Sequence, residues 1–247
     1  MLKKSVLPKG LTIVTGGNSP EDSNAQPLPS IPVLSKTLLL LHLEAQEPAA
    51  DLNRLSELIL GDVGATLQVL RLAGREYSDP EGPGRIEDCI CDLGLQRCLD
   101  AMPVATVTGR ERRAAMANLW DHSRVVAVYS KLIAKGMPGI CPDRAYLAGL
   151  LHGIGWMPKI FAWGECEECD EQGCADPVRI ATRLSLPGFV LDILRDKAED
   201  ETAVRWSDIV QLAHLATAKL FVKEPSDKPR SHRSADMDRS QLYTRWN

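Results

Sequence analysis

The sequence lacks both an excess of positive charge and a long apolar run. Its 29 Lys and Arg residues against 33 Asp and Glu residues leave a formal net charge of -4, so the chain is not built chiefly to neutralise nucleic-acid phosphates. The apolar run TLLLLHL, from Thr37 to Leu43, is much too short to cross a bilayer. No apolar signal-peptide core follows Lys3 and Lys4, because Pro8 interrupts the segment. We therefore expect a cytoplasmic protein that spans no membrane, and nucleic acid is disfavoured as a partner.

Signs of β-structure and of common catalytic motifs are absent as well. No segment alternates apolar and polar residues as a strand does, and there is neither a Gly-rich phosphate loop nor a Ser-His-Asp arrangement. Apolar residues instead recur at helical spacing, in segments that begin at Val33, Asp51, Ala65 and Leu119, and GRERR at Gly109 indicates a solvated helix start. With 44% hydrophobic and 25% charged residues, the composition is that of a globular domain. The sequence predicts an all-α fold, one domain with two helical lobes.

Polar sequence without hydrophobic periodicity flanks the helical region. Residues 1–27 end in GGNSPEDSNAQP and predict a flexible leader, and the mixed charges of residues 224–247 predict a polar tail. The helical domain is therefore expected at residues 28–223. The chain has seven cysteines, an odd number, which fits a reducing cytosol better than a disulfide framework.

The segment 164–176, GECEECDEQGCAD, combines six acidic residues with three cysteines. Cys166, Cys169 and Cys174 could offer three thiolates to zinc, but a structural zinc site has four ligands and the usual second pair is absent. We favour an acidic surface loop with reduced thiols. Three further cysteines are interpreted as packing residues of a helical segment, namely Cys89, Cys91 and Cys98.

Four of the five histidines lie on predicted helices, and three of them, His122, His152 and His214, lie on the later helices of the chain. Leu119–Lys135 is expected to form a helix with His122 in its first turn, GMPGICP reverses the chain, and a second helix returns to His152. At about 1.5 Å per residue the two helices rise about 20 Å and fall about 14 Å, so both imidazoles lie toward one end of an antiparallel hairpin. His214 follows on an apolar face of the last long helix. A lone histidine on such a face is more often a hydrogen-bonded core residue than a ligand, and three together keep both interpretations open.

Five segments occur in the order typical of one family. They are LPSIP at Leu28, GDVGATLQVLRLAG at Gly61, RIEDCICDLGLQR at Arg85, LWDHS at Leu119 and AYLAGLLHGIG at Ala145. Over about residues 28 to 222 the chain resembles the HD superfamily of metal phosphohydrolases, and more closely its HDOD branch. The resemblance implies an HD-like helical bundle.

The resemblance also implies which residues stand at a degenerate HD site. HD phosphohydrolases build their site from a histidine, a His-Asp pair and a distant aspartate. By position His122 matches the first and His152 the histidine of the pair, whereas Gly153 replaces the paired aspartate and His214 the distant one. With both carboxylates missing, we expect no catalytic residue, no cofactor and no metal. What the resemblance implies is a non-catalytic bacterial signal-transduction module that binds another signalling protein or domain, and self-association stays open.

The alternative to a binding module is an enzyme. A metal-dependent HD-type phosphohydrolase or cyclic-dinucleotide phosphodiesterase would need an atypical histidine-rich site, with His122, His152 and His214 holding the metal. Asp121 or Asp208 would have to assist, because the usual carboxylates are gone. The Gly-Tyr-Pro signature of the HD branch that hydrolyses cyclic dinucleotides is absent.

A third function, DNA binding, depends on the segment 52–74. It has the length of a helix-turn-helix, with Gly61 and Gly64 marking the turn. Its second helix offers little beyond Gln68 and Arg71 to touch base edges or phosphates. DNA binding would require that this helix be exposed.

Overall fold

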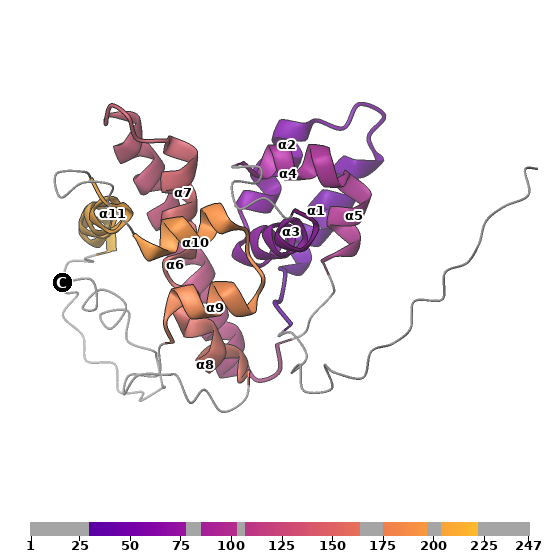
Figure 1. The fold of residues 1–247 in the computed structure, drawn as a ribbon. Coiled ribbons are helices and arrows are strands. Elements are labelled where there is room, and N and C mark those ends of the chain that lie inside the picture. The colour runs from indigo at the N-terminus through magenta and orange to yellow at the C-terminus, as the bar shows by residue number, and fades with distance from the viewer. Residues whose placement is uncertain (1–29, 78–84, 103–106, 164–174, 197–203, 222–247) are drawn as a thin grey trace, which may run out of the picture.

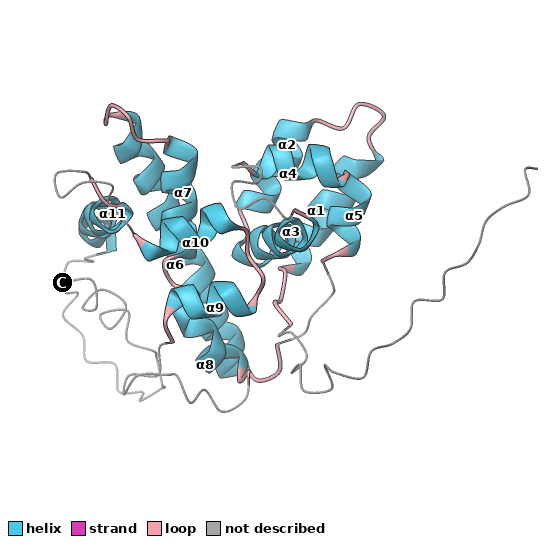
Figure 2. Ribbon diagram, viewed as in Figure 1, coloured by secondary structure: helices cyan, strands magenta, loops and turns pink. Residues whose placement is uncertain are grey.

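The computed structural model describes residues 30–77, 85–102, 107–163, 175–196 and 204–221 (Figure 1). Within these ranges every regular element is helical (Figure 2). The elements are α1 (Ser35–Gln46), α2 (Leu52–Leu60), α3 (Val63–Glu76), α4 (Ile86–Leu93), α5 (Leu95–Asp100), α6 (Arg110–Lys135), α7 (Pro142–Leu151), the 3-10 helix η1 (Ile154–Trp156), α8 (Met157–Phe161), α9 (Pro177–Arg183), α10 (Gly188–Arg195) and α11 (Trp206–Phe221). The all-α prediction is confirmed. None of these helices is both long and apolar enough to cross a membrane.

Several predicted features lie outside the described residues. They are the leader 1–27, the tail 224–247 and the cysteines Cys166, Cys169 and Cys174. The boundaries of the helical domain therefore stay predictions, and so does the acidic loop with reduced thiols.

The helices form two lobes that share one hydrophobic core (Figure 1). In the first lobe, α1 to α5, the central helix α3 is buried along most of its length. Asp62 caps α3, since its carboxylate accepts hydrogen bonds from the backbone N–H groups of Gly64 and Ala65. The first lobe is thus organised around one apolar helix whose start is fixed by a buried carboxylate.

The second lobe is built on the hairpin of α6 and α7, against which α11 packs. Gly149 on α7 lets the two hairpin helices approach closely, because a Cβ at this position would lie only 2.7 Å from both the Cα atom of Ala127 and the Oγ atom of Ser130 on α6. The hairpin is the antiparallel pair that the sequence predicts, and it carries two of the three histidines.

Helix α6 begins at Arg110, so the prediction that this helix starts at Leu119 is wrong. His122 therefore lies in the middle of α6 and not in its first turn. The reason is that residues 110–114 are exposed, so no apolar stripe marks them, although their Arg, Glu and Ala residues have high helix propensity. The solvated helix start predicted at Gly109 is confirmed, because Gly109 is the N-cap of α6.

Helix α3 cannot act as a DNA-reading helix, because it lies in the core. Gln68 is 4% exposed and its side-chain amide donates a hydrogen bond to the carbonyl oxygen of Ile31 at 3.0 Å. The helix-turn-helix interpretation of residues 52–74 is therefore wrong. The length of the segment suggested it, but the first eight residues of α3, Val63 to Leu70, carry no charge and place the helix inside the lobe and not in a groove.

One of the predicted packing cysteines faces solvent. Cys89 and Cys98 are buried, and burial raises the pKa of their thiols to about 12 and about 11. Cys91 is exposed, so its interpretation as a packing residue is wrong. Helix α4 buries Cys89, Ile90 and Leu93 on one face, and a residue two positions from Cys89 points away from that face.

Candidate functional site

Three histidines from three helices meet in the second lobe. His122 lies in the middle of α6, His152 is the C-cap of α7, and His214 lies within α11. Their ring centroids are 5.2 Å apart for His122 and His152, 5.0 Å for His122 and His214, and 4.8 Å for His152 and His214. One ring nitrogen from each residue lies within 4.8 Å of the other two. The structure thus brings together all three histidines that the sequence places at the degenerate site.

The end of α7 fixes the position of His152. Its Nδ1 atom lies 2.6 Å from the carbonyl oxygen of Gly149, one turn earlier. Because a carbonyl oxygen only accepts, Nδ1 carries the proton and donates it in this bond. In the neutral ring the lone pair is therefore on Nε2. Gly149 contributes twice, since its missing side chain also allows α7 to approach α6.

Burial keeps two of the imidazoles neutral. Desolvation lowers the pKa of His152 to about 4, although the hydrogen bond to Gly149 opposes this change. Desolvation also lowers the pKa of His214, to about 3, and repulsion from His152 and His122 adds to the effect. Both rings are uncharged at neutral pH, so their unprotonated nitrogens can act as Lewis bases.

No carboxylate joins the three histidines within the described part of the chain. Asp121, next to His122, is exposed and pairs with Arg124 at 3.6 Å. Asp208 is exposed as well, and it accepts a hydrogen bond from the backbone N–H of Arg205. Neither aspartate therefore supplies the missing ligand that an enzyme would need.

The space that the side chain of the paired aspartate would need is occupied by other side chains. Gly153 has φ -89° and ψ 5°, a conformation open to any residue. A Cβ atom there would lie 2.7 Å from the Cδ1 atom of Leu119 and 3.5 Å from the Oγ atom of Ser123. Leu119 is 1% exposed, so an aliphatic side chain occupies the space next to His152 that a carboxylate would need.

This ligand set does not fit a two-metal hydrolytic centre. Hard cations such as Mg²⁺ and Mn²⁺ require carboxylate oxygens, and two such ions held together require several. Three imidazoles without a carboxylate do not neutralise that charge. The donor set suits at most one borderline cation, for which imidazole nitrogen is a preferred ligand.

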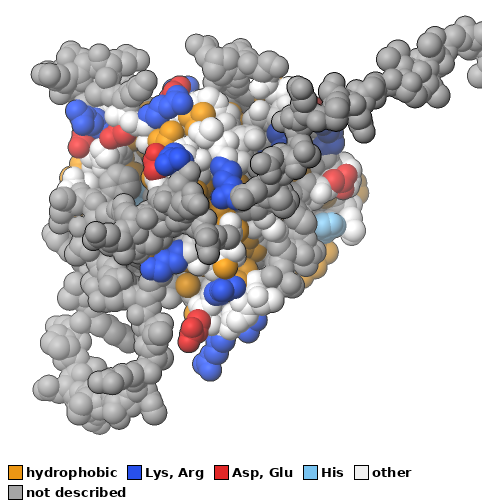
Figure 3. Space-filling view, turned by 60° about the horizontal axis from the view of Figure 1, so that its bottom comes forward, with side chains coloured by type: hydrophobic (Ala, Val, Ile, Leu, Met, Phe, Trp, Pro, Cys, Tyr) orange, Lys and Arg blue, Asp and Glu red, His pale blue; other side chains and the backbone are white. Residues whose placement is uncertain are grey.

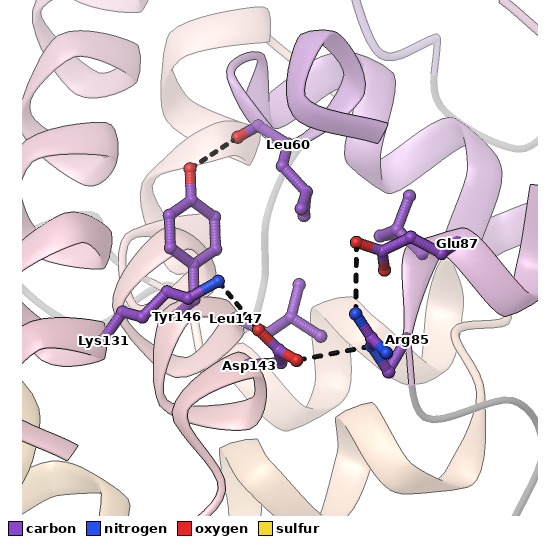
Figure 4. Close-up of a pocket in the computed structure, with 8 residues that line it drawn as sticks. Leu60, Arg85, Glu87, Lys131, Asp143, Tyr146 and Leu147 are labelled. Atoms are coloured by element: carbon purple, nitrogen blue, oxygen red, sulfur yellow. Dashed lines mark hydrogen bonds and ion pairs between the residues drawn. The ribbon is translucent and has the colours of Figure 1, made fainter. Parts of the chain in front are cut away.

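A second polar cluster, which sequence reasoning missed, lies where the two lobes meet (Figure 4). Asp143 at the start of α7 pairs with Lys131 of α6 at 2.8 Å and with Arg85, just before α4, at 3.3 Å. Tyr146 donates a hydrogen bond to the carbonyl oxygen of Leu60 at 2.9 Å. The cavity that they line holds only about 20 Å³, so it is a junction between lobes and not a ligand site. Leu60 and Arg85 lie far in sequence from Lys131, Asp143 and Tyr146, and no local pattern links the two groups.

Comparisons with known proteins agree with this architecture. A family model described as "HDOD domain" matches residues 28–163, a range that includes His122 and His152 but not His214. A crystal structure of a fragment of the MmoQ response regulator from Methylococcus capsulatus str. Bath has a TM-score of 0.60 and 21% identity over 79% of this chain and 87% of that chain. A second MmoQ crystal structure has a TM-score of 0.60 and 20% identity over 78% and 88%. No curated protein matches the chain. At such identities the likeness to MmoQ is one of fold.

Proposed function

Because the chain belongs to the HDOD domain family, we propose that it is a non-catalytic module of bacterial, cytoplasmic signal transduction that binds another signalling protein or domain. A role in signal transduction is supported by the family and by the response-regulator neighbours. The proposal adds two claims to a role in signal transduction. The first is that the protein catalyses no reaction, and the second is that it acts by binding a partner.

The absence of carboxylates around the described histidines carries the first part of the proposal. Hydrolysis at an HD-like site needs charged ligands to hold the cations and to orient the attacking water. Here Gly153 stands beside His152, and Leu119 fills the adjoining space. Desolvation further disfavours a protonated His152 or His214, so neither imidazole is suited to act as a general acid near neutral pH.

Exposed apolar side chains support the second part. Val128 and Leu132 of α6 are 44% and 55% exposed, and Leu212 and Leu215 of α11 are 45% and 56% exposed. Each pair is spaced by three or four residues and so lies on one side of its helix. Exposed apolar side chains that gather in a patch mark surfaces that bind proteins.

The surface gives less support to nucleic acid as a partner. On the face shown in Figure 3, the Lys and Arg side chains of the described residues are dispersed among apolar and acidic ones. Binding to phosphates favours basic side chains gathered in one patch or stripe. The net charge of -4 points in the same direction.

A hydrolysis assay tests the claim against catalysis. Purified protein is incubated with a cyclic dinucleotide and with Mg²⁺, Mn²⁺ or Zn²⁺ in turn, beside the variant His122→Ala. We expect no turnover above that of the variant with any cation. Metal-dependent turnover that His122→Ala abolishes would overturn the proposal.

Site-specific crosslinking tests the claim of binding. A photo-crosslinking residue at Leu132 or Leu215 should capture one defined protein in cells, whereas the same residue at Glu57, exposed on α2, should not capture it. Equal capture from all three positions would contradict a binding surface on α6 and α11.

A further inference from the structure

The described residues contain one group of side chains with the chemistry of a cation site, and that group has no acidic member. It consists of His122, His152 and His214. Each comes from a different helix, so the convergence is a property of the fold and not of a local loop. His152 is 9% and His214 is 6% exposed, and His122 is partly buried.

The nitrogens are close to the spacing that one ion requires. Zinc binds imidazole nitrogen at about 2.0–2.1 Å with tetrahedral geometry, which puts two ligand nitrogens about 3.4 Å apart. The three nitrogens lie within 4.8 Å of one another, so small rotations of the imidazoles would close the site. The three helices already place the imidazole rings side by side, so no movement of a helix is needed to bind an ion.

His152 has the kind of hydrogen-bond partner that a metal-binding histidine usually has. Ligating histidines typically donate their second ring N–H to a backbone carbonyl or a carboxylate, which fixes the tautomer and the direction of the ring. The Nδ1–H group of His152 donates to the carbonyl oxygen of Gly149 at 2.6 Å. Its Nε2 lone pair is thereby oriented as a ligand.

We propose that His122, His152 and His214 form a mononuclear site for a borderline divalent cation, with Zn²⁺ as the representative ion. Neutral imidazoles bind Zn²⁺, Ni²⁺ and Cu²⁺ well, whereas Mg²⁺ and Ca²⁺ need oxygen ligands. The site differs in kind from a two-metal centre, which this ligand set does not fit. It links α11 to the α6–α7 hairpin, so a bound ion stabilises the position of the last helix. The proposal is independent of whether the protein is an enzyme.

Calorimetry and thermal melting test the site directly. The full chain is treated with a chelator, dialysed and titrated with Zn²⁺, and a variant with Cys166, Cys169 and Cys174 replaced by Ser is titrated in parallel. We expect one equivalent of Zn²⁺ in both proteins and a rise of Tm with Zn²⁺ that Mg²⁺ does not produce. If the cysteine variant binds no zinc, the thiolates are the ligands and the proposal is wrong.

Two further variants separate ligand loss from misfolding. His214→Gln keeps a polar side chain of similar size, and we expect Kd for Zn²⁺ to rise at least about 100-fold, since even outer-shell changes cost 10–100-fold. His42 is exposed on α1, so His42→Gln is the matched control and should bind Zn²⁺ as wild type does. Circular dichroism and the Tm without metal show whether His214→Gln folds, and if it does not, His122→Gln at the partly buried position replaces it. A folded ligand variant with wild-type affinity overturns the proposal, as does wild-type protein that binds no zinc.

Discussion

The indole Nε1–H group of Trp120 donates a hydrogen bond to the Oδ1 atom of Asp62 at 2.9 Å, across the boundary between the two lobes. The same carboxylate accepts from the backbone N–H groups of Leu34, Gly64 and Ala65. Asp62 is fully buried. One side chain therefore fixes the segment before α1, the start of α3 and the middle of α6, which is the helix that carries His122.

Removal of this carboxylate should destabilise both lobes together. Asp62→Ala leaves four donors without their acceptor, and each buried donor left in this way costs about 1–3 kcal/mol, so we expect a loss of about 3 kcal/mol or more in the free energy of unfolding. Trp120→Phe removes one of these bonds and should cost about 1–3 kcal/mol. Urea denaturation measures both changes.

Asp51→Ala is the matched control for this prediction. Asp51 is also the N-cap of a helix, but it is exposed and its carboxylate accepts a hydrogen bond from the backbone N–H of Asn53. Its removal should cost about 1 kcal/mol. A loss in Asp62→Ala no greater than that in Asp51→Ala would contradict the central role of Asp62.

The close approach of α7 to α6 predicts a strong effect at Gly149. The Cβ atom of Gly149→Ala would lie 2.7 Å from the Cα atom and 2.9 Å from the nitrogen of Ala127, and backbone atoms cannot move aside as a side chain end can. We expect a loss of about 1–3 kcal/mol or more in the free energy of unfolding, measured by urea denaturation.

A second glycine provides the comparison. Gly136 follows α6 with a negative φ of -88°, and a Cβ there would meet the carbonyl oxygen of Ile133 at an ordinary 3.5 Å. Gly136→Ala should be neutral or stabilising by up to about 1 kcal/mol. Similar losses at the two positions would mean that helix propensity, and not the contact between α6 and α7, decides the outcome.

The buried imidazoles make stability depend on pH. His152 and His214 have folded-state pKa values of about 4 and about 3, below the ordinary histidine pKa of 6.5, so the unfolded state binds more protons between these values. Their contribution is complete above pH 6.5 and is lost as the pH falls toward 4. In chelator-treated protein, we expect a loss of about 1.4 kcal/mol for each histidine between pH 8 and pH 5.5.

Denaturant titrations at a series of pH values measure this loss. His152→Gln should reduce the slope of stability against pH in this range, because a glutamine does not titrate. An unchanged slope in that variant, folded at pH 8, would show that other groups cause the acid sensitivity.

Features of the fold that depend on residues close together in the sequence could be predicted, whereas features that depend on residues far apart in the sequence could not. Helical periodicity predicts the hairpin and the meeting of His122 with His152, because both follow from the rise of a helix along one stretch of chain. The bond between Asp62 and Trp120 joins residues 58 positions apart, and no local pattern reports such a pair. The space next to Gly153 is filled by Leu119, which only the packing of α6 on α7 reveals. The helix start predicted at Gly109 could not be joined to the helix predicted from Leu119, because the exposed first turn of α6 buries no apolar face.

The missing carboxylates can be put back to test how the site differs from that of an HD phosphohydrolase. The variant Gly153→Asp with His214→Asp rebuilds the ligand set that the family resemblance implies. The dihedral angles at Gly153 allow a side chain, but the new Cβ must displace the δ-methyl group of Leu119. Leu119→Ala, which by itself should cost about 2–5 kcal/mol, makes room, so Gly153→Asp should be less destabilising in that background than in wild type.

Mn²⁺ distinguishes the wild-type set of three imidazoles from the variant set that contains carboxylates. Buried carboxylates without a cation destabilise the folded protein, and Mn²⁺, which carboxylate oxygens suit, should reverse this loss in the Gly153→Asp, His214→Asp variant. A cation that binds only the folded state stabilises it by RT ln(1 + [L]/Kd), so about 100 Kd of Mn²⁺ should add about 2.7 kcal/mol. Thermal melts with and without Mn²⁺ measure this gain, and wild type, which has imidazoles alone, should show none. If the variant folds but its Tm does not respond to Mn²⁺, residues 153 and 214 do not face a common ion, and the match between this cluster and the HD site fails.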